Sequence, residues 1–314
     1  MKCKMNQNKQ NTTVEIDGKP VELTHLEKVY WPEEGITKGD LIAYYREISP
    51  VILPYLIDRP QSLNRFPNGI IGEHFFQKDI NDAPKWAETI RLKTESKNEE
   101  LVDYLVCQDE ATLIYMINLG CIEINPWSSR VNSLDNPDYA VIELDAHSST
   151  FAMTVQVALV VHQILEEIGA VNRVKTSGQT GLHIFVPLAA KYSYEQARQF
   201  AQMISQKVNR QVPELTSLES KPQKYIGKIH LDYPQNAKGK TMVAAYSLRP
   251  RPGAPVSTPL DWDELHQPGI SPLDFTIKNI RDRLARKGDL FSAVLGPGIE
   301  LADCLDKLSA GSPI

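Results

Sequence analysis

One stretch, residues 139–147 (YAVIELDAH), constrains the fold more than any other part of the chain. Its apolar run predicts a β-strand that ends in two carboxylates, Glu143 and Asp145, two positions apart. Because side chains alternate between the two faces of a strand, both carboxylates project from one face while Ile142 and Leu144 point into a core. Two like charges this close repel unless a cation lies between them, so the pattern favours a divalent metal site. A solvated strand end is the alternative for this segment alone.

The composition excludes several classes of protein. With 314 residues, 42% of them apolar, the chain can bury the core of one large or two ordinary domains. No apolar run is long enough to cross a bilayer and the N-terminus is polar, so we expect a cytoplasmic protein that does not contact a membrane. We expect a disordered tail over residues 1–13 and one catalytic domain over residues 14–314. Four scattered cysteines predict neither a zinc site nor a disulfide framework.

The charge is unevenly distributed along the chain. The net charge of −5 argues against a protein that coats nucleic acid. Residues 221–251, however, contain seven lysines and arginines and only one acid, Asp232. Such a segment suits a site where metal, phosphate and carboxylate meet, although surface lysines on an edge strand would look similar.

The N-terminal part of the domain predicts a hairpin and a helix. Residues 14–24 alternate apolar and polar side chains around an Asp-Gly pair, which is typical of a β-hairpin. A helix follows Asp40, its expected N-cap, and is interrupted at Pro50. Lys28 and Lys38 precede this helix, where a phosphate would bind; solvated lysines are the simpler interpretation.

Other helices and strands follow from hydrophobic periodicity. A short strand over residues 74–78 carries Phe75 and Phe76, of which one is expected in the core and the other exposed, where it would stack on a nucleobase. Helices are predicted for residues 109–119, 151–168, 193–210 and 271–288, the third beginning with a capping box of Ser193 and Gln196. Strands are predicted for residues 121–124, 172–175, 182–186, 227–232 and 240–246.

Polar side chains on three of these strands complete a candidate site. Glu143 and Asp145, His183, and His230 with Asp232 each lie opposite an apolar strand face. The turn at residues 176–181 (TSGQTG) offers hydroxyls, glycines and backbone N–H groups to an anion. Three carboxylates near such a turn fit two-metal phosphoryl or nucleotidyl transfer, on an α+β fold with a sheet, helices behind it and a cleft in front.

Three motifs resemble, in the same order and at similar separations, those of the polymerase domain of bacterial ligase D. They are Glu143-Leu144-Asp145, residues 177–183 (SGQTGLH) and residues 231–236 (LDYPQN). That domain belongs to the archaeo-eukaryotic primase superfamily and works in non-homologous end joining. The resemblance covers nearly all of residues 14–310.

The resemblance implies a primase-polymerase fold, with two antiparallel or mixed sheets and flanking helices around a central nucleotide cleft. It implies a template-dependent nucleotidyltransferase that fills gaps at DNA double-strand breaks and prefers ribonucleotides. Two Mg²⁺ or Mn²⁺ ions would be held by Glu143, Asp145 and Asp232, and a nucleoside triphosphate would be the substrate. The implied partners are gapped DNA with a 5′-phosphate, a DNA ligase and an end-binding protein, in the cytoplasm at the nucleoid.

The resemblance also implies roles for further residues. Lys28 and Lys38 would bind the 5′-phosphate of the downstream strand, and Phe75 and Phe76 would stack on bases. The residues expected to contact the incoming nucleotide are Ser177, Gly178, Gln179, Thr180, His183, Gln235, Arg249, Asn125 and Arg65.

The chain departs from the family pattern at three places. Glu143 stands where the family usually has Asp, Leu63 and Asn64 replace basic residues, and Asn125 replaces a frequent His. Two other functions are therefore considered: a catalytically weak module that binds and bridges DNA ends, and a two-metal nuclease, which the triphosphate-type turn and the basic loop disfavour.

Overall fold

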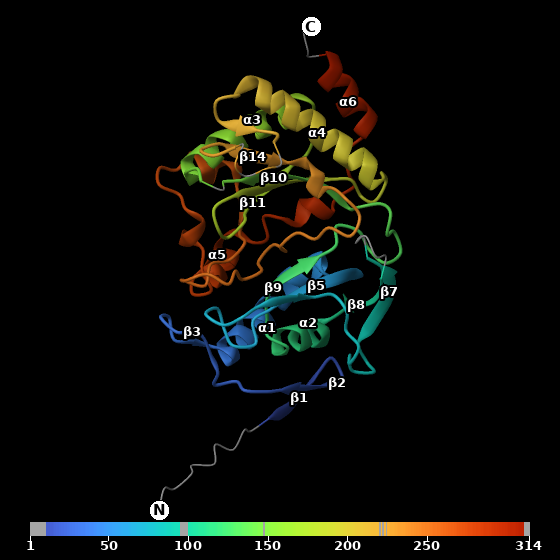
Figure 1. Cartoon of the computed structure of the whole chain (residues 1–314), viewed down its shortest axis with the longest axis vertical. Helices are drawn as coiled ribbons and strands as arrows, with labels where there is room; N and C mark the ends of the chain where they lie inside the picture. Colours follow the sequence, from blue (N-terminus) through green and yellow to red (C-terminus); the bar gives the residue numbers. More distant parts are fainter. Residues whose placement is uncertain are drawn as a thin grey trace, which may run out of the picture.

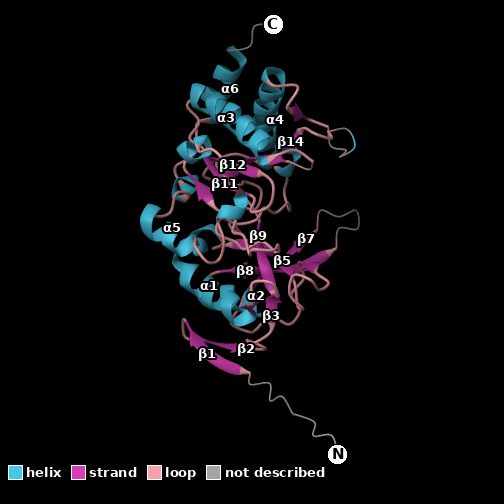
Figure 2. Cartoon of the chain, turned by 90° about the vertical axis from the view of Figure 1, so that its left-hand side faces the viewer, coloured by secondary structure: helices cyan, strands magenta, loops and turns pink. Residues whose placement is uncertain are grey.

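Two β-sheets lie one above the other in the computed structural model, and each carries helices on its outer side (Figure 1, Figure 2). The structure describes residues 11–94, 100–146, 148–219, 221, 223 and 225–310. The arrangement confirms the α+β class and the two sheets expected from the sequence. His147, at the end of the acidic stretch, falls outside the described residues.

The larger sheet carries the acidic strand at its centre. Its strand order is β13 (Thr216–Ser217), β14 (Ile229–Asp232), β10 (Tyr139–Asp145), β12 (Leu182–Pro187), β11 (Arg173–Thr176) and β15 (Pro259–Leu260). Neighbours pair antiparallel except β13 and β14. Helices α3 (Phe151–Glu167) and α4 (Tyr194–Gln211) cover its outer face, and α6 (Leu301–Ala310) packs beyond them (Figure 1).

The smaller sheet is built around β5 (Arg59–Arg65). This strand pairs with β6 (Phe75–Gln77), β8 (Leu101–Cys107) and β9 (Cys121–Pro126), and β8 pairs with β7 (Glu88–Lys93). Helices α1 (Lys38–Ile52) and α2 (Glu110–Asn118) cover its outer face. Two further hairpins, β1 (Thr12–Ile16) with β2 (Lys19–Leu23) and β3 (Val29–Trp31) with β4 (Ile36–Thr37), border this half.

Shorter elements complete the fold. Helix α5 (Ile280–Lys287) lies on the side of the molecule (Figure 2). Single turns of 3₁₀-helix occupy residues Leu53–Tyr55, Tyr233–Gln235, Trp262–His266, Pro272–Asp274 and Ser292–Leu295.

Strand β10 shows why a cleft forms between the sheets. Its even-numbered residues, Ile142 among them, pack into the core beneath α3 and α4. Its odd-numbered residues face the other sheet: Tyr139 and Val141 join the core of the smaller half, whereas Glu143 and Asp145 are partly exposed. One strand face is therefore apolar where the halves pack and charged where they separate, as the period of two requires.

Several local expectations are confirmed and others are corrected. The capping box of α4 is present, and the first hairpin turns at Asp17-Gly18, but its strand begins at Thr12, inside the expected tail. The N-cap of α1 is Thr37, and Asp40 is its N3 partner in a capping box. The helix also continues through Pro50. Proline has no N–H to donate to the Arg46 carbonyl four residues earlier, and the Ser49 hydroxyl donates to that carbonyl instead, at 2.9 Å.

The prediction that one of Phe75 and Phe76 is buried is wrong. The two side chains are 46% and 57% exposed. Among the described strands β6 pairs only with β5, and because these adjacent residues point to opposite faces, their exposure shows that neither face of β6 is covered. Both rings are therefore available to a ligand.

The C-terminal third departs most from the periodicity. Residues 240–246 run antiparallel beside β9, where Met242 N and Ala244 N donate to the Pro126 and Ile124 carbonyls at 3.4 and 3.0 Å, but only Thr241 forms a bridge, with Trp127, so no regular strand results. The expected helix over residues 271–288 is reduced to α5, since Asn279 Oδ1 accepts from Thr276 N at 2.9 Å and holds a turn before it. Helix α6 was not predicted from the sequence.

Candidate functional site

Four charged or polar residues lie in a row across the larger sheet. Lys175 on β11 is opposite His183 on β12, His183 is opposite Glu143 on β10, and Glu143 is opposite Asp232 on β14. Directly opposed residues in antiparallel strands project from the same face. The sheet therefore brings together acids from distant parts of the chain, and Asp145 lies two residues farther along the same face.

These acids line a cavity of about 430 Å³ that contains most of the nucleotide contacts expected from the sequence. Its predicted members are Glu143, Asp145, Asp232, Ser177, Gln179, Thr180, His183, Gln235, Arg249 and Asn125. The glycine Gly178 lies beside it, and Arg65 lies in a different cavity, with Lys28 and Lys38. One cavity thus combines three carboxylates, a hydroxyl-rich turn and an arginine.

The carboxylates are held where they repel each other. Burial and the neighbouring charges of Asp232 and Asp145 raise the pKa of Glu143 to about 7. Within the described residues, no group of three or more histidine, cysteine, aspartate or glutamate side chains is arranged to hold a metal ion. Oxygen donors that suit Mg²⁺ or Mn²⁺ nonetheless face one cavity, and a divalent cation would relieve their repulsion. The chemistry of the donors fits such an ion, although their arrangement in this structure does not yet form its ligand set.

The turn after β11 is shaped by a hydroxyl and two glycines. Ser177 Oγ accepts from the backbone N–H groups of Gln179 at 3.2 Å and Gly181 at 3.0 Å, so its own hydrogen is what it offers to a ligand. A Cβ on Gly181 would lie 2.3 Å from the Leu144 carbonyl, and one on Gly178, with φ +72°, would lie 2.5 Å from Arg249. Only glycine lets the turn approach β10 and Arg249 this closely.

A buried glutamate, which the sequence did not single out, supports two residues of the cavity. Glu123 on β9 is 7% exposed; its Oε2 lies 3.2 Å from Arg249 Nε and its Oε1 accepts from Asn125 Nδ2 at 3.1 Å. Asn125, one residue beyond the strand expected over residues 121–124, is buried within β9. Its bonds to Glu123 show that it orients an acid that in turn balances the charge of Arg249.

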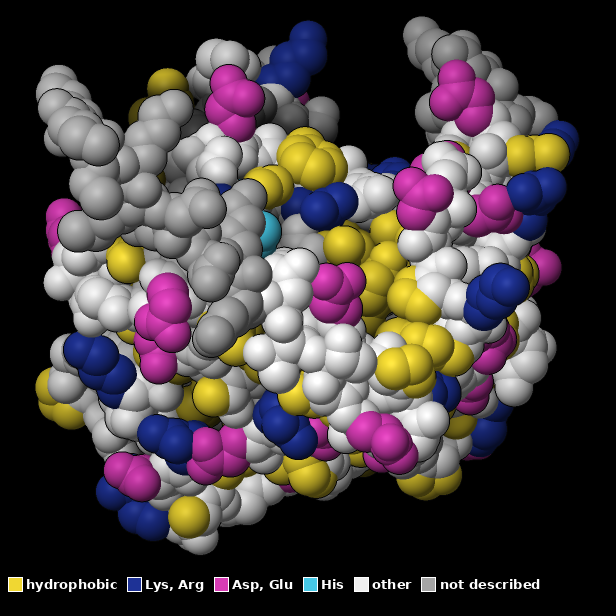
Figure 3. Space-filling view, turned by 90° about the horizontal axis from the view of Figure 1, so that it is seen from below, with side chains coloured by type: hydrophobic (Ala, Val, Ile, Leu, Met, Phe, Trp, Pro, Cys, Tyr) yellow, Lys and Arg dark blue, Asp and Glu magenta, His cyan; other side chains and the backbone are white. Residues whose placement is uncertain are grey.

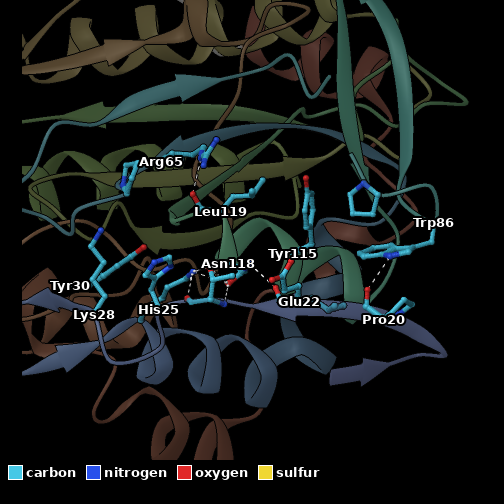
Figure 4. Close-up of a pocket in the computed structure, with 15 residues that line it drawn as sticks. Pro20, Glu22, His25, Lys28, Tyr30, Arg65, Trp86, Tyr115, Asn118 and Leu119 are labelled. Atoms are coloured by element: carbon cyan, nitrogen blue, oxygen red, sulfur yellow. Dashed lines mark hydrogen bonds between the residues drawn. The ribbon is translucent and has the colours of Figure 1, made fainter. Parts of the chain in front are cut away.

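A second cavity, of about 550 Å³, gathers the cations Lys28, Lys38 and Arg65 (Figure 4). Lys38 is 3% exposed, and its Nζ donates to Thr24 O at 2.6 Å and Asn118 Oδ1 at 2.8 Å. Burial, and then the charges of Lys28 and Arg65, lower the pKa of Lys38 from its usual 10.5 to about 8. Three cations held together in this way favour an anion with more than one negative charge, such as a terminal phosphate.

The exposed aromatic pair lies between these two cavities. The Arg65 guanidinium is 5.3 Å from the centroid of the Phe75 ring, which places this ring beside the cationic cavity. Phe76 lines a third cavity, of about 760 Å³, which shares Gln235 and Thr241 with the acid cavity. Rings in this position can stack on bases that connect a phosphate at one site with a nucleotide at the other.

Among the described residues, the lower face of the molecule carries no large patch of a single charge (Figure 3). On the face shown in Figure 3, acidic and basic side chains are interspersed. Local cations within cavities, rather than the net charge of −5, are therefore the groups that could attract a nucleic acid.

Lys175 is the second residue that the sequence reasoning missed. The strand before the turn was predicted, and antiparallel pairing around the turn at residues 176–181 would have placed Lys175 opposite His183. The register of this hairpin is therefore the sequence signal that indicates Lys175. Burial lowers the pKa values of both Lys175 and His183 below their usual ranges.

Comparisons with known proteins agree with this geometry. Residues 37–291 match the family model described as the LigD primase-polymerase domain. The non-homologous end joining proteins LigD of Bacillus subtilis and Mycolicibacterium smegmatis are 33% and 30% identical over 85% and 91% of this chain. The chain spans less than half the length of these relatives, 43% and 37%.

A solved structure is also similar. The polymerase domain of Mycobacterium tuberculosis ligase D, in complex with DNA, superposes with a TM-score of 0.81 at 28% identity. The match covers 89% of this chain and 99% of that one. Separately, none of the helices in the described ranges has both the length and the apolar content that crossing a lipid bilayer requires.

Proposed function

Because the chain belongs to the LigD primase-polymerase family, we propose that it is a nucleotidyltransferase that adds nucleotides to DNA ends during non-homologous end joining. The observation that carries this proposal is the acid cavity, where carboxylates from β10 and β14 meet the turn of residues 177–181 and Arg249. Separate groups for cations and for a triphosphate are what nucleotidyl transfer needs.

Glu143, Asp145 and Asp232 would hold two Mg²⁺ or Mn²⁺ ions. Bound there, the ions would supply the positive charge that stabilises the attacking oxygen and the departing pyrophosphate. The chain's own residues bind and orient the nucleotide. The hydrogen bonds to the nucleotide's phosphates would come from the Ser177 hydroxyl, the His183 ring and the Arg249 guanidinium, all of which line the same cavity.

The cationic cavity supports recognition of a 5′-phosphate on the downstream strand. Lys28 and Lys38 approach from the loop before α1 and from its first turn, and Arg65 adds a third cation. Phe75 and Phe76 would stack on bases in the gap between this phosphate and the incoming nucleotide. The substrate would thus be gapped or broken DNA with a 5′-phosphate.

Further parts of the proposal rest on the family alone. They are a preference for ribonucleotides, action beside a DNA ligase and an end-binding protein, and a location at the nucleoid in the cytoplasm.

Primer extension on gapped DNA tests the proposal. Ribo- and deoxynucleotides are compared in Mg²⁺ and in Mn²⁺, each with a 5′-phosphate or a 5′-hydroxyl on the downstream strand. We expect template-dependent incorporation that needs a divalent metal, favours ribonucleotides and is stimulated by the 5′-phosphate. Absence of incorporation under every condition contradicts it, and degradation of the DNA without added nucleotide would indicate a nuclease.

A second candidate is an end-binding module with weak catalysis. It is favoured by the separation of the two cavities, since the cationic one needs none of the carboxylates. In that case phosphorylated ends bind tightly, and binding falls when Lys28 and Lys38 are changed, while no nucleotide is incorporated in either metal.

A further inference from the structure

Lys175 is a fully buried lysine to which the proposed chemistry gives no role. It is 0% exposed and lies at the closed end of the row that continues through His183 to Glu143 and Asp232. A lysine is rarely placed in a protein interior unless its amine is hydrogen-bonded. What Lys175 contacts therefore indicates what it does.

Two hydrogen bonds determine the direction in which Lys175 donates. Ser257 Oγ donates its only hydrogen to the Thr176 carbonyl at 2.7 Å. The same oxygen lies 2.7 Å from Lys175 Nζ, so here it must accept. A second N–H of Lys175 is then available to His183 Nδ1, 2.9 Å away, and the amine also sits 5.6 Å from the centroid of the Phe185 ring. Ser257, His183 and Phe185 therefore hold the amine in place.

The other ring nitrogen faces a carboxylate. His183 Nε2 lies 3.6 Å from Glu143 Oε1. If Nδ1 accepts from Lys175, the hydrogen of the neutral ring is on Nε2 and points toward Glu143 and the acid cavity. When Glu143 is ionised, the opposite tautomer would set a bare Nε2 lone pair against its carboxylate. Both contacts of the ring therefore fit the same tautomer.

We propose that Lys175 is a positioning residue that holds His183 in the Nε2–H tautomer, aimed into the acid cavity to donate to a phosphate oxygen of the incoming nucleotide. The identity of this acceptor rests on the proposed function. The tautomer does not, because it is a property of the protein without any ligand.

Nitrogen-15 NMR of the histidine rings in the full chain tests the proposal directly. His183→Gln identifies the His183 signals by their loss. We expect a bare Nδ1 and a protonated Nε2 in the wild-type protein. A hydrogen on Nδ1 would overturn the proposal, whether or not the protein polymerises nucleotides, so this failure is distinct from failure of the proposed function.

Lys175→Met keeps the length of the side chain and removes its donors. We expect the single-tautomer spectrum of His183 to be lost and KM for the nucleotide to rise about tenfold, the effect of losing one oriented hydrogen bond. Affinity for 5′-phosphorylated DNA should not change, because that cavity lies in the other half of the molecule. Lys175→Gln, which retains an N–H donor, should recover part of the loss.

Two comparisons separate positioning from packing. In the His183→Gln background, Lys175→Met should add nothing to KM, and Lys191→Met, on a surface lysine paired with Glu300, should leave both spectrum and KM unchanged. An unaltered His183 spectrum in Lys175→Met, or an equal rise of KM in both backgrounds, overturns the proposal.

If Lys175→Met does not fold, Ser257→Ala provides a second test, because it removes one hydrogen-bond partner of the amine. This variant should give a mixture of His183 tautomers, and a wild-type spectrum there overturns the proposal.

Discussion

The acid cavity and the cationic cavity are built in opposite ways. The first is set by register within one sheet, where one residue from each of four strands stands in a row. The second is assembled from the first hairpin, the loop before α1, the end of α2 and strand β5. One concentrates negative charge and raises the pKa of Glu143, and the other concentrates positive charge and lowers that of Lys38.

This contrast indicates a division of work between the cavities. Rigid strands hold the groups that would do chemistry, where small displacements matter most. Loops and helix ends hold the groups that would recognise a phosphate, which needs charge more than exact placement. If the division is real, each cavity can be disabled without affecting the other, and the predictions below test this in order of expected effect.

The largest effect should follow from removing an acid. Asp232→Ala and Asp145→Ala should each lower nucleotide incorporation by about a thousandfold, because the remaining carboxylates cannot hold both cations. Binding of 5′-phosphorylated ends, measured by fluorescence anisotropy, should stay within about twofold, since no phosphate contact is lost. Asp303→Ala, on exposed α6, is the matched control. Wild-type incorporation by either acid variant would contradict the site.

Removing Lys38, the buried lysine of the cationic cavity, should weaken end binding and spare nucleotide incorporation. Lys38→Met should weaken binding of a 5′-phosphorylated end by about thirtyfold, the effect of removing one of the three positive charges beside the phosphate. Binding of a 5′-hydroxyl end, and incorporation on an open primer-template without a downstream strand, should change little. Equal losses for both kinds of end would mean that Lys38 does not read the phosphate.

The exposed rings should matter to both cavities. Phe76→Ala should lower incorporation opposite a template base in a gap by about tenfold, since stacking on one base contributes about 1–3 kcal/mol. Leu273→Ala, at another exposed apolar side chain, serves as the control. An effect confined to folding stability, seen as a lower Tm with unchanged incorporation, would show that the ring does not contact DNA.

The smallest effect concerns pH. Because the pKa of Lys38 is about 8 in the free protein, phosphate binding must take up a proton above that pH. The Kd of phosphorylated ends should therefore be flat below about pH 7.5 and rise by roughly fivefold to tenfold by about pH 9. The same lysine makes folding more favourable as pH rises between 8 and 10.5, since the unfolded chain then binds more protons. Lys38→Met should abolish the pH dependence of Kd. If the pH dependence persists in this variant, another group causes it.

Local pattern predicted much of the larger sheet. The alternation in β10, β12 and β14 placed Glu143, Asp145, His183 and Asp232 on polar faces, and the structure joins those faces side by side. The capping box of α4 was also read correctly, because it depends on residues three positions apart. The fold and the family both followed from motifs in these segments.

Other features depended on contacts that periodicity does not contain. Phe75 and Phe76 are both exposed because β6 is an edge strand, and an edge is a property of the assembled sheet. Arg65 was expected at the nucleotide, yet it lines the cationic cavity, where its Nε donates to the Leu119 carbonyl at 2.8 Å. That placement results from the way β5 pairs with its neighbours.

The amino-acid sequence by itself determined which residues are candidates for the proposed chemistry and which face of a strand each occupies, since both follow from side-chain type and a period of two. The tertiary structure decided which of them meet. Only the pairing of four strands sets Lys175 behind His183 and Asp232 beside Glu143, because register between distant segments is chosen by the packing of the whole core.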